Sequence, residues 1–412
     1  MSDNKKILII AHQWPPHGAV AALRIYKFAK HFKLHGFDIK ILTTEKYFFD
    51  GHQKNIYPNI GCEVIYVNYG HFKNSHWEEK PKQPIDSNKY SLITSLLKQI
   101  NQRIRQYSGS LFDIHDLAVS NACKLAIDLR KHWQYEMILS SYGPSFSHKV
   151  AFRLKKQFPN IYWLADFRDL WYGNHTLKLL KIFSIFEKLV EKRTIKLSNR
   201  IITVSEGLKK ILKKRYPIKP VDIVKNYGEL VELDLLKKTN NFKIERNVPL
   251  KIIYTGTIYK QQNFADVLKL LNKLENIELH LYGNFSKTIL RYCKQYSFLK
   301  INGFIPRKRI LQLQENADIL LFLEWGDPNV NGILTGKLFE YLFSDTPILA
   351  IGKYYKESSQ LIETTDRGKY CPDINSINNF IDEITQGNYR LDKTKLKKYT
   401  FESQISKLII KM

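Results

Sequence analysis

Residues 331–342 carry side chains suited to holding a phosphorylated ligand, in the order NGILTGKLFEYL. The glycines predict a loop that opens a short helix, whose free N–H groups and positive dipole end suit a diphosphate. Lys337 adds a point charge, and Glu340, one turn later, can accept hydrogen bonds from a ribose diol. The same spacing also fits an ordinary ion pair on a helix surface, so both interpretations stay open.

A second polar group stands at the end of a predicted strand, where residues 163–171 read WLADFRDLW. Asp166 and Asp169 lie three residues apart, with Arg168 between them and tryptophans on both sides. Carboxylates at a strand end can orient the hydroxyls of a sugar-like ligand. A buried Asp–Arg pair with a purely structural role is the alternative.

The loop after the first predicted strand reads AHQWPPHGAV and leads into a helix. Its glycine, Gly18, can let backbone N–H groups approach an anion, and Arg24 on the helix can add a cation. The loop lacks the full G-x-G-x-x-G pattern, and glycines often serve turn geometry alone. We treat an anion-binding role for this loop as one of two interpretations.

Short apolar runs of strand length alternate with longer stretches of helical period, which predicts an α/β protein with two doubly wound, Rossmann-like domains. The predicted strands are residues 6–11, 38–44, 63–67, 137–140, 162–166 and 201–204, then 250–254, 277–282, 299–302, 319–323 and 347–350. We place the domains at residues 1–225 and 250–390, with a linker at 226–249. A C-terminal helix within 391–412 is expected to pack back toward the first domain. Ligands of such sheets bind beyond the carboxyl ends of the strands, so we expect a cleft there, between the domains.

Composition points to an anionic partner. The 412 residues include 65 Lys+Arg and 39 Asp+Glu, a formal net charge of +26, which can draw the protein to nucleic acid, an acidic membrane or phosphorylated substrates. Residues 92–106 and 176–196 are amphipathic and basic, and either lie on a membrane surface or simply pack on their sheet. Residues 71–90 predict a long loop. We expect no secretion signal, no transmembrane segment and no zinc site or disulfide framework.

The whole chain resembles a GT-B glycosyltransferase of the family-4 type (glycosyltransferase group 1), enzymes of bacterial polysaccharide biosynthesis. The resemblance rests on motifs in order: the Pro-Pro-x-Gly loop ending at Gly18, Asp-Phe-Arg-Asp-Leu-Trp at 166–171, Ile-Thr-Val-Ser at 202–205, Val-Lys-Asn at 224–226, Tyr-Thr-Gly ending at Gly256, Ala-Asp at 317–318, and Thr-Gly-Lys-Leu-Phe-Glu-Tyr-Leu at 335–342 before Pro-Ile-Leu-Ala at 347–350. Their order and spacing carry the resemblance together.

This resemblance implies an acceptor-side N-terminal domain and a C-terminal domain that binds a UDP- or GDP-linked sugar. Glu340 would hold the ribose, Gly18 would close over the donor, and Lys337, Asp166 and Asp169 would act in catalysis. The other implied donor-binding residues are Gly256, Lys260, Asn331, Gly332, Ile333, Leu334, Thr335 and Gly336. No metal and no further cofactor are implied, because basic side chains and helix dipoles stabilise the leaving diphosphate.

The resemblance also implies a hexosyltransferase that acts with retention on a lipid-linked or oligosaccharide acceptor, as in lipopolysaccharide synthesis. Such an enzyme would be cytoplasmic and peripheral at the inner face of the cell membrane, on an anionic surface. A nucleotide-sugar epimerase of the same architecture is the first alternative. A basic nucleic-acid-binding protein is the second, but the sequence has no helix-turn-helix, zinc-finger, RNP or KH signature, and we expect no nucleic-acid partner.

The sequence departs from the family at three positions. Gly332 stands where the family often has a glutamate, and Thr257 stands where an arginine is frequent. Residues 140–144, Ser-Ser-Tyr-Gly-Pro, occupy the region of a frequent histidine. His148 lies one helical turn further on and His12 lies in another loop, and the sequence assigns the histidine role to neither.

Overall fold

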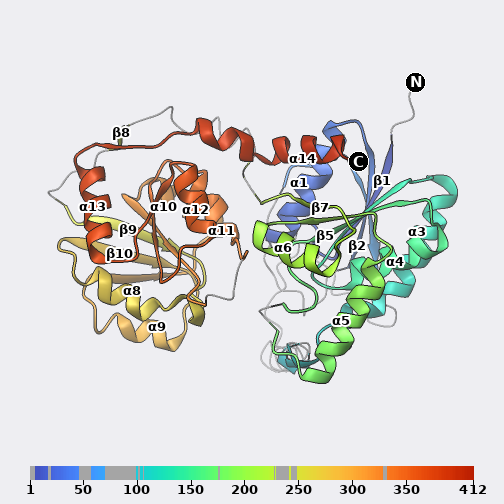
Figure 1. Cartoon of the computed structure of the whole chain (residues 1–412), viewed down its shortest axis with the longest axis horizontal. Helices are drawn as coiled ribbons and strands as arrows, with labels where there is room; N and C mark the ends of the chain where they lie inside the picture. The colour runs from blue at the N-terminus through green and yellow to red at the C-terminus, as the bar shows by residue number, and fades with distance from the viewer. Residues whose placement is uncertain are drawn as a thin grey trace, which may run out of the picture. The chain divides into compact units, whose positions relative to one another are not determined.

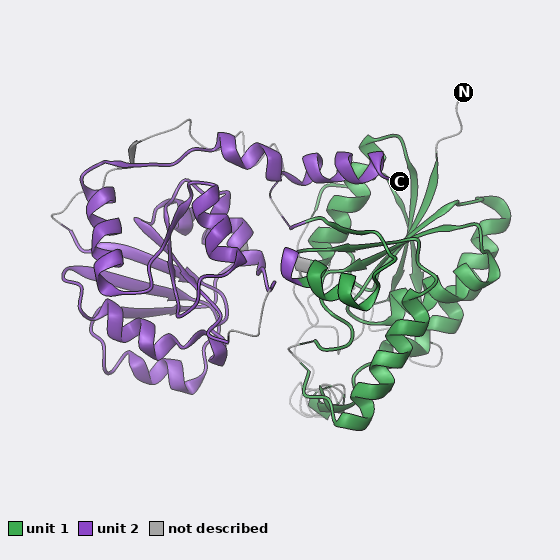
Figure 2. Ribbon diagram, in the orientation of Figure 1, with its two compact units in different colours: residues 1–204, 208–224 green, residues 205–207, 225–412 purple. Residues whose placement is uncertain are grey.

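The computed structural model describes residues 5–16, 20–45, 57–69, 99–100, 103–104, 106–174, 177–226, 228, 241–242, 248–327 and 332–412. The chain separates into two compact units, unit 1 with Met1–Val204 and Leu208–Val224, and unit 2 with Ser205–Gly207 and Lys225–Met412 (Figure 2). Each unit has a parallel sheet with helices on both sides (Figure 1). The two predicted doubly wound domains are therefore confirmed. The predicted linker at 226–249 lies mostly outside the described residues, and the exact domain bounds stay a prediction.

Unit 1 is built on a sheet whose described strands follow the order β3-β2-β1-β4-β5-β6-β7. β2 and β3 lie on one side of β1, and β4 to β7 lie on the other side. The connections that follow β1 and β4 therefore run in opposite directions from the carboxyl edge, which is where such sheets bind ligands. The elements are β1 (Lys6–Ile10), α1 (Val20–Leu34), β2 (Asp38–Thr44), β3 (Glu63–Val67), η1 (Ile114–Ala118), α3 (Val119–His132), β4 (Met137–Ser141), α4 (Phe146–Gln157), β5 (Tyr162–Phe167), α5 (Lys181–Ile195), β6 (Arg200–Thr203), α6 (Glu206–Arg215) and β7 (Val221–Ile223).

Unit 2 repeats this plan with the described strand order β11-β10-β9-β12-β13-β14, which reverses between β9 and β12. A short antiparallel pair, β8 with β15, stands apart from this sheet. The elements are β8 (Asn241–Phe242), β9 (Leu250–Thr255), η2 (Lys260–Gln262), α8 (Phe264–Leu271), β10 (Ile277–Tyr282), α9 (Lys287–Tyr292), β11 (Leu299–Gly303), α10 (Arg307–Glu315), β12 (Ile319–Leu323), α11 (Gly336–Leu342), β13 (Ile348–Ile351), α12 (Glu357–Thr364), β14 (Gly368–Tyr370), α13 (Ile374–Thr385), β15 (Tyr389–Arg390), η3 (Thr394–Tyr399) and α14 (Phe401–Ile410).

The central strands are apolar on both faces, as parallel strands covered by helices must be. On β9, Ile252 and Tyr254 pack into the core on one side of the sheet, and Ile253 packs into the core on the other side. All five residues of β12 are buried. This two-sided burial is why these strands read as short continuous apolar runs in the sequence.

A buried ion pair ties helix α1 to strand β5 in unit 1. The Arg24 guanidinium donates to both carboxylate oxygens of Asp166, from Nε at 2.9 Å and from Nη2 at 2.6 Å. Arg24 Nη1 also donates to the carbonyl of Val224 at 2.6 Å, and the Ser141 hydroxyl donates to Asp166 at 2.8 Å. Both charged side chains are almost completely buried. Their charges are compensated inside the unit, so each depends on the other.

The expected strands match the structure closely, apart from the short strands β7, β8, β14 and β15. β2, β3, β10 and β12 have the predicted bounds. The three-residue strands β7 and β14 were not predicted, because runs this short carry little periodicity. None of the described helices is long and apolar enough to cross a bilayer.

We predict that Arg24→Met lowers the free energy of unfolding by about 3–5 kcal/mol, because it leaves the Asp166 carboxylate buried without its cation. Urea unfolding measures this loss. Arg200→Met is the matched control, since Arg200 pairs with Asp222 at a partly exposed site and its loss should cost about 1 kcal/mol or less. Equal losses of unfolding free energy in the two variants would show that the buried Arg24–Asp166 pair stabilises the protein no more than the Arg200–Asp222 pair does.

Candidate functional site

The carboxyl edge of the unit 2 sheet places two loops side by side where the strand order reverses. These loops follow β9 and β12, and hydrogen bonds join them. Gly326 N donates to the carbonyl of Gln261 at 2.7 Å, and Gln262 Nε2 donates to the carbonyl of Leu323 at 3.0 Å. The Tyr259 and Trp325 rings stack at a centroid distance of 5.3 Å. Ligands of doubly wound sheets bind at this position, so these two loops form the candidate ligand site of unit 2.

Two glycines leave the backbone bare at the ends of β9 and β10. Gly256 has φ of +97°, a conformation that side chains rarely adopt. Its N–H donates to the carbonyl of Tyr282 at 2.7 Å, and a Cβ built on the neighbouring Gly283 would lie 2.7 Å from the Gly256 carbonyl oxygen. Gly283 was not among the predicted site residues. The sequence signal for it is the Tyr-Gly that follows a strand, like the Tyr-Thr-Gly that ends at Gly256.

The Lys337 ammonium packs against the end of β9. Its Nζ lies 3.5 Å from the centroid of the Tyr254 ring, a cation–π contact, and 3.6 Å from where a Cβ on Gly256 would stand. The helix that carries it is held in place by Tyr341, whose hydroxyl oxygen accepts a hydrogen bond from Thr255 N at 3.0 Å. Burial lowers the pKa of Lys337 to about 7, and the negative charge of Glu340 opposes that shift.

The structure therefore places Lys337 beside Gly256, with Glu340 one turn later on α11, and the roles of these residues in donor binding stay predictions. Thr335 precedes α11 as its N-cap residue, and its hydroxyl is buried without a hydrogen-bond partner among the described residues. Gly332, Ile333, Leu334 and Gly336 lead into the same helix, and Leu334 is buried in the core. Lys260 is exposed on η2. Gly18 and Asn331 lie outside the described residues.

In unit 1, the two aspartates of the predicted pair have different surroundings. Asp166 is buried and bound to Arg24 and Ser141, which favours the structural alternative for this residue. The Asp169 side chain is 43% exposed, with its carboxylate 3.7 Å from Arg168 Nε. Arg168 also donates to the carbonyl of Tyr142 at 3.0 Å. Of the two carboxylates, that of Asp169 is open to a ligand. The catalytic roles of both remain predictions.

The histidines of unit 1 fall into two kinds. His148 is completely buried, its Nδ1 lies 2.8 Å from Ser140 Oγ, and burial lowers its pKa to about 3, so it stays neutral. His12 instead follows β1 at the carboxyl edge, where its ring meets that of His115 at a centroid distance of 4.2 Å. His115 Nδ1 lies 2.5 Å from Asp113 Oδ1. Sequence reasoning missed His115 and Asp113, because more than a hundred residues separate His115 from His12.

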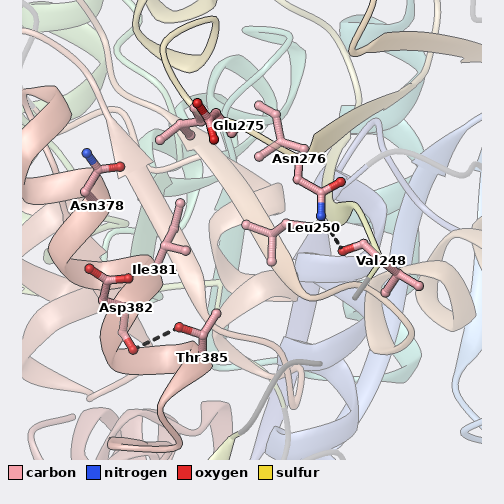
Figure 3. Close-up of a pocket in the computed structure, with 10 residues that line it drawn as sticks. Val248, Leu250, Glu275, Asn276, Asn378, Ile381, Asp382 and Thr385 are labelled. Carbon is pink, nitrogen blue, oxygen red and sulfur yellow. Dashed lines mark hydrogen bonds between the residues drawn. The ribbon is translucent and has the colours of Figure 1, made fainter. Parts of the chain in front are cut away.

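Two pockets of unit 2 lie apart from Lys337. One of about 400 Å³ lies at the amino ends of β9 and β10, between Asn276 and the α13 side chains Asn378 and Asp382 (Figure 3). It opens at the sheet edge opposite to Gly256. The other, of about 230 Å³, adjoins Glu324, whose carboxylate accepts hydrogen bonds from the Ser358 and Ser359 hydroxyls at 2.7 and 2.5 Å. Glu324 thereby holds the start of α12, a structural role.

Among the described residues, no group of three or more His, Cys, Asp or Glu side chains is placed to hold a metal ion. The chemistry that the carboxyl edge of unit 2 offers comes from an ammonium, a carboxylate and bare backbone. An ammonium beside glycine backbone suits a phosphate group, and a carboxylate one turn away suits a diol.

Comparisons with solved structures identify the architecture. The lipopolysaccharide outer core galactosyltransferase WaaB matches with a TM-score of 0.59 at 12% identity, over 98% of this chain and 99% of that one. HepE from Anabaena, solved with UDP and glucose, matches with a TM-score of 0.60 at 13% identity, over 99% and 100%. A UDP-GlcNAc 2-epimerase from Methanocaldococcus jannaschii matches with a TM-score of 0.53 at 11% identity, over 99% and 100%.

These neighbours show that the chain has the two-domain GT-B fold, as expected from the resemblance. No family model matches the sequence, and no curated protein is significantly similar to it. At identities of 11% to 13%, these structural matches show the fold alone.

We predict that Lys337, whose ammonium packs against Tyr254, makes the ligand-free protein more stable as pH rises. The Lys337 pKa is about 7 in the folded protein, against 10.5 for an unperturbed lysine. Between these values the unfolded chain binds a proton that the folded chain does not, so the free energy of unfolding rises with pH.

Urea unfolding at several pH values between about 7 and 9.5 measures this slope. Lys337→Met should flatten it relative to wild type, and Lys269→Met, at an exposed lysine of α8, should leave it unchanged. A slope that Lys337→Met does not alter would show that the lysine is solvated in the ligand-free protein.

Proposed function

We propose that the chain is a glycosyltransferase that moves a sugar from a nucleoside diphosphate sugar to a lipid-linked or oligosaccharide acceptor in bacterial surface polysaccharide synthesis. The observation that carries the proposal is the Lys337 ammonium, packed beside the bare backbone of Gly256 where the unit 2 sheet reverses its strand order. A diphosphate is a ligand that an ammonium would recognise, and the absence of a side chain at Gly256 leaves room for a phosphate group beside it. One structural neighbour, HepE, was solved with UDP and glucose, which supports a nucleotide-sugar donor.

In this proposal, Lys337 stabilises the negative charge that builds up on the departing diphosphate. Its ammonium is partly deprotonated near pH 7 before the donor binds, because burial has lowered its pKa. The charge of a bound diphosphate raises that pKa and keeps the proton in place. A preorganised cation in a site that excludes water acts more strongly than the same cation in water. Transfer by these groups requires neither a metal nor a further cofactor.

Glu340 and Lys260 complete the proposed donor site. Glu340 follows Lys337 on α11, where its carboxylate can accept from the ribose hydroxyls. Lys260, exposed after the Gly256 turn, can add a second cation for the phosphates. Gly18, Asn331 and the loop residues before α11 keep their proposed roles as backbone contacts to the donor.

The acceptor is proposed to bind at the carboxyl edge of the unit 1 sheet. Asp169 offers an exposed carboxylate there. We propose retention of the anomeric configuration and a hexosyl donor, from the resemblance to family-4 enzymes. We further propose that the enzyme works at the cytoplasmic face of an anionic membrane, because the chain has a formal net charge of +26.

A nucleotide-sugar epimerase is the second candidate, because epimerases share the GT-B fold, as the Methanocaldococcus jannaschii structure illustrates. Both functions use the same donor site. They differ in the products, because an epimerase returns a nucleotide sugar and a transferase releases the free nucleoside diphosphate.

The first test is a thermal-shift screen of the purified protein against UDP, GDP and a panel of their sugars, with and without added divalent metal. A ligand that binds only the folded state raises the unfolding midpoint. A shift with one nucleotide class, in metal-free buffer, is the expected result. Incubation with the sugar that binds, followed by NMR of the anomeric protons, then separates transfer from epimerisation and reports the stereochemistry. A protein that no nucleotide stabilises would overturn the proposal.

We predict that Glu340→Ala and Lys337→Met each weaken nucleoside diphosphate binding about 10- to 100-fold, as expected for the loss of a charged hydrogen-bonding partner. Isothermal titration calorimetry with the nucleotide found in the screen gives these affinities. Lys269→Met serves as the control for removing a lysine. Unchanged affinity in folded Glu340→Ala protein would remove the ribose assignment, and unchanged affinity in Lys337→Met would remove the diphosphate assignment.

A further inference from the structure

Helix α5 of unit 1 buries two glutamates beside Thr194 and Ile195 and leaves four large apolar side chains exposed. The inner face holds Glu187 and Glu191, both 2% exposed. The outer face holds Ile182, Ile185, Phe186 and Leu189, which are 59%, 60%, 47% and 58% exposed. An ordinary surface helix keeps its large apolar side chains on the stripe that faces the core and its charged side chains outside.

The two glutamates anchor the helix through hydrogen bonds that fix which face points inward. Ser110 donates to Glu187 Oε1 from its N–H and its hydroxyl, both at 2.6 Å. Gly109, with φ of +64°, permits this approach, because a Cβ there would lie 2.8 Å from Glu187 Cδ. Burial raises the pKa of Glu187, and the bonds from Ser110 oppose the shift.

Glu191, one turn later, is held in the same way. It accepts from Tyr172 N at 2.6 Å, from the Tyr216 hydroxyl at 2.8 Å and from Arg215 Nη1 at 3.0 Å. Turning α5 to hide its apolar face would break all of these bonds and leave buried carboxylates behind. The outward direction of the apolar face is therefore fixed by the fold.

Neighbouring segments extend the apolar surface. Leu180, the N-cap residue of α5, is 53% exposed and its N–H donates to the carbonyl of Tyr107 at 3.1 Å. The Phe112 ring contacts the Phe183 ring at a centroid distance of 6.3 Å. Tyr107, Leu111 and Phe112 are 46%, 44% and 59% exposed. We call this surface the α5 face, and its members are Tyr107, Leu111, Phe112, Leu180, Ile182, Ile185, Phe186 and Leu189.

All the exposed charges on α5 are positive. Lys181, Lys188, Lys192 and Arg193 are exposed, as are Lys178 before the helix and Lys196 after it, while both glutamates of the helix are buried. An apolar stripe bordered by lysine and arginine is the pattern of a helix that lies in the interface of an anionic bilayer. A protein partner covering the same face would need a matching apolar surface within an acidic rim.

We propose that the α5 face is a docking surface that inserts its apolar side chains into the interface of an anionic lipid bilayer. The lysines and Arg193 then meet the lipid phosphates. The purpose of docking rests on the proposed function, because it would bring the enzyme to a lipid-linked acceptor. Bilayer binding itself involves no nucleotide, so it succeeds or fails independently of transfer.

Vesicle sedimentation of the full chain tests the proposal, with phosphatidylcholine vesicles and with vesicles that contain about 30% phosphatidylglycerol. Wild type should sediment with the anionic vesicles. Ile185→Glu/Leu189→Glu should lower the partition coefficient by about tenfold or more, because two inserting side chains are replaced by charges. Leu34→Glu/Ile218→Glu makes the same change of charge at residues 71% and 90% exposed elsewhere in unit 1 and should bind like wild type.

A second pair of variants isolates the electrostatic contribution. Lys181→Gln/Lys188→Gln/Lys192→Gln should remove most of the preference for anionic vesicles. Lys273→Gln/Lys287→Gln/Lys294→Gln, at exposed lysines of unit 2, loses the same charge and should keep that preference. Thermal unfolding confirms that each variant folds, and a variant that fails to fold is replaced by the single change Ile185→Gln.

Three results would overturn the proposal. The first is wild-type protein that does not sediment with anionic vesicles. The second is an equal loss of binding in the α5 variants and in their matched controls, which would indicate a diffuse effect of net charge. The third is a wild-type dimer that becomes monomeric in Ile185→Glu/Leu189→Glu, measured by light scattering without lipid, which would make the face an interface between two copies.

Discussion

Burial of the Lys337 ammonium against the end of β9 is the constraint on which the carboxyl edge of unit 2 depends. The charge lies over the Tyr254 ring and beside Gly256, whose φ of +97° disfavours any side chain. Tyr341 fixes the helix that carries the lysine by its bond to Thr255. Holding a lysine there lowers its pKa and costs stability in the absence of an anion. Such a cost is expected at a site that is completed by its ligand.

In unit 1, by contrast, the buried charged side chains are paired with partners within the fold. Arg24 and Asp166 satisfy each other, and Glu187 and Glu191 are held by hydroxyl, backbone and guanidinium donors. The Asp169 carboxylate and the α5 face, by contrast, are exposed to ligands and surfaces. The contrast between satisfied and unsatisfied charge therefore separates structural positions from candidate functional ones.

Much of the fold was predictable because parallel strands buried on both faces leave a plain sequence signal. β12 was predicted with its observed bounds for this reason. The sequence also indicated the motif at 335–342 as a candidate site, because the types and spacing of its glycine, lysine and glutamate can be recognised without a structure. The sequence could not distinguish a surface ion pair from a ligand site at this motif. The distinction depends on packing, because the Lys337 ammonium lies against the Tyr254 ring, which is distant in sequence.

Other features depend on contacts between distant residues and were beyond sequence reasoning. Asp113 and His115 meet His12 through the topology of the sheet. The direction of α5 is decided by Ser110 and Arg215, so its periodicity alone left two interpretations open. Expectations for residues 71–90, Gly18 and Asn331 concern segments outside the described residues.

The central claim is that Lys337 is the cation that receives a donor diphosphate, and proton uptake on binding tests it most directly. UDP-glucose and GDP-mannose, whose diphosphates do not titrate near neutral pH, are the ligands for calorimetry at about pH 8 in buffers of different ionisation enthalpy. The account predicts that the nucleotide sugar that binds takes up close to one proton, and that Lys337→Met abolishes this uptake. Binding without proton uptake, or uptake that persists in Lys337→Met, would contradict it.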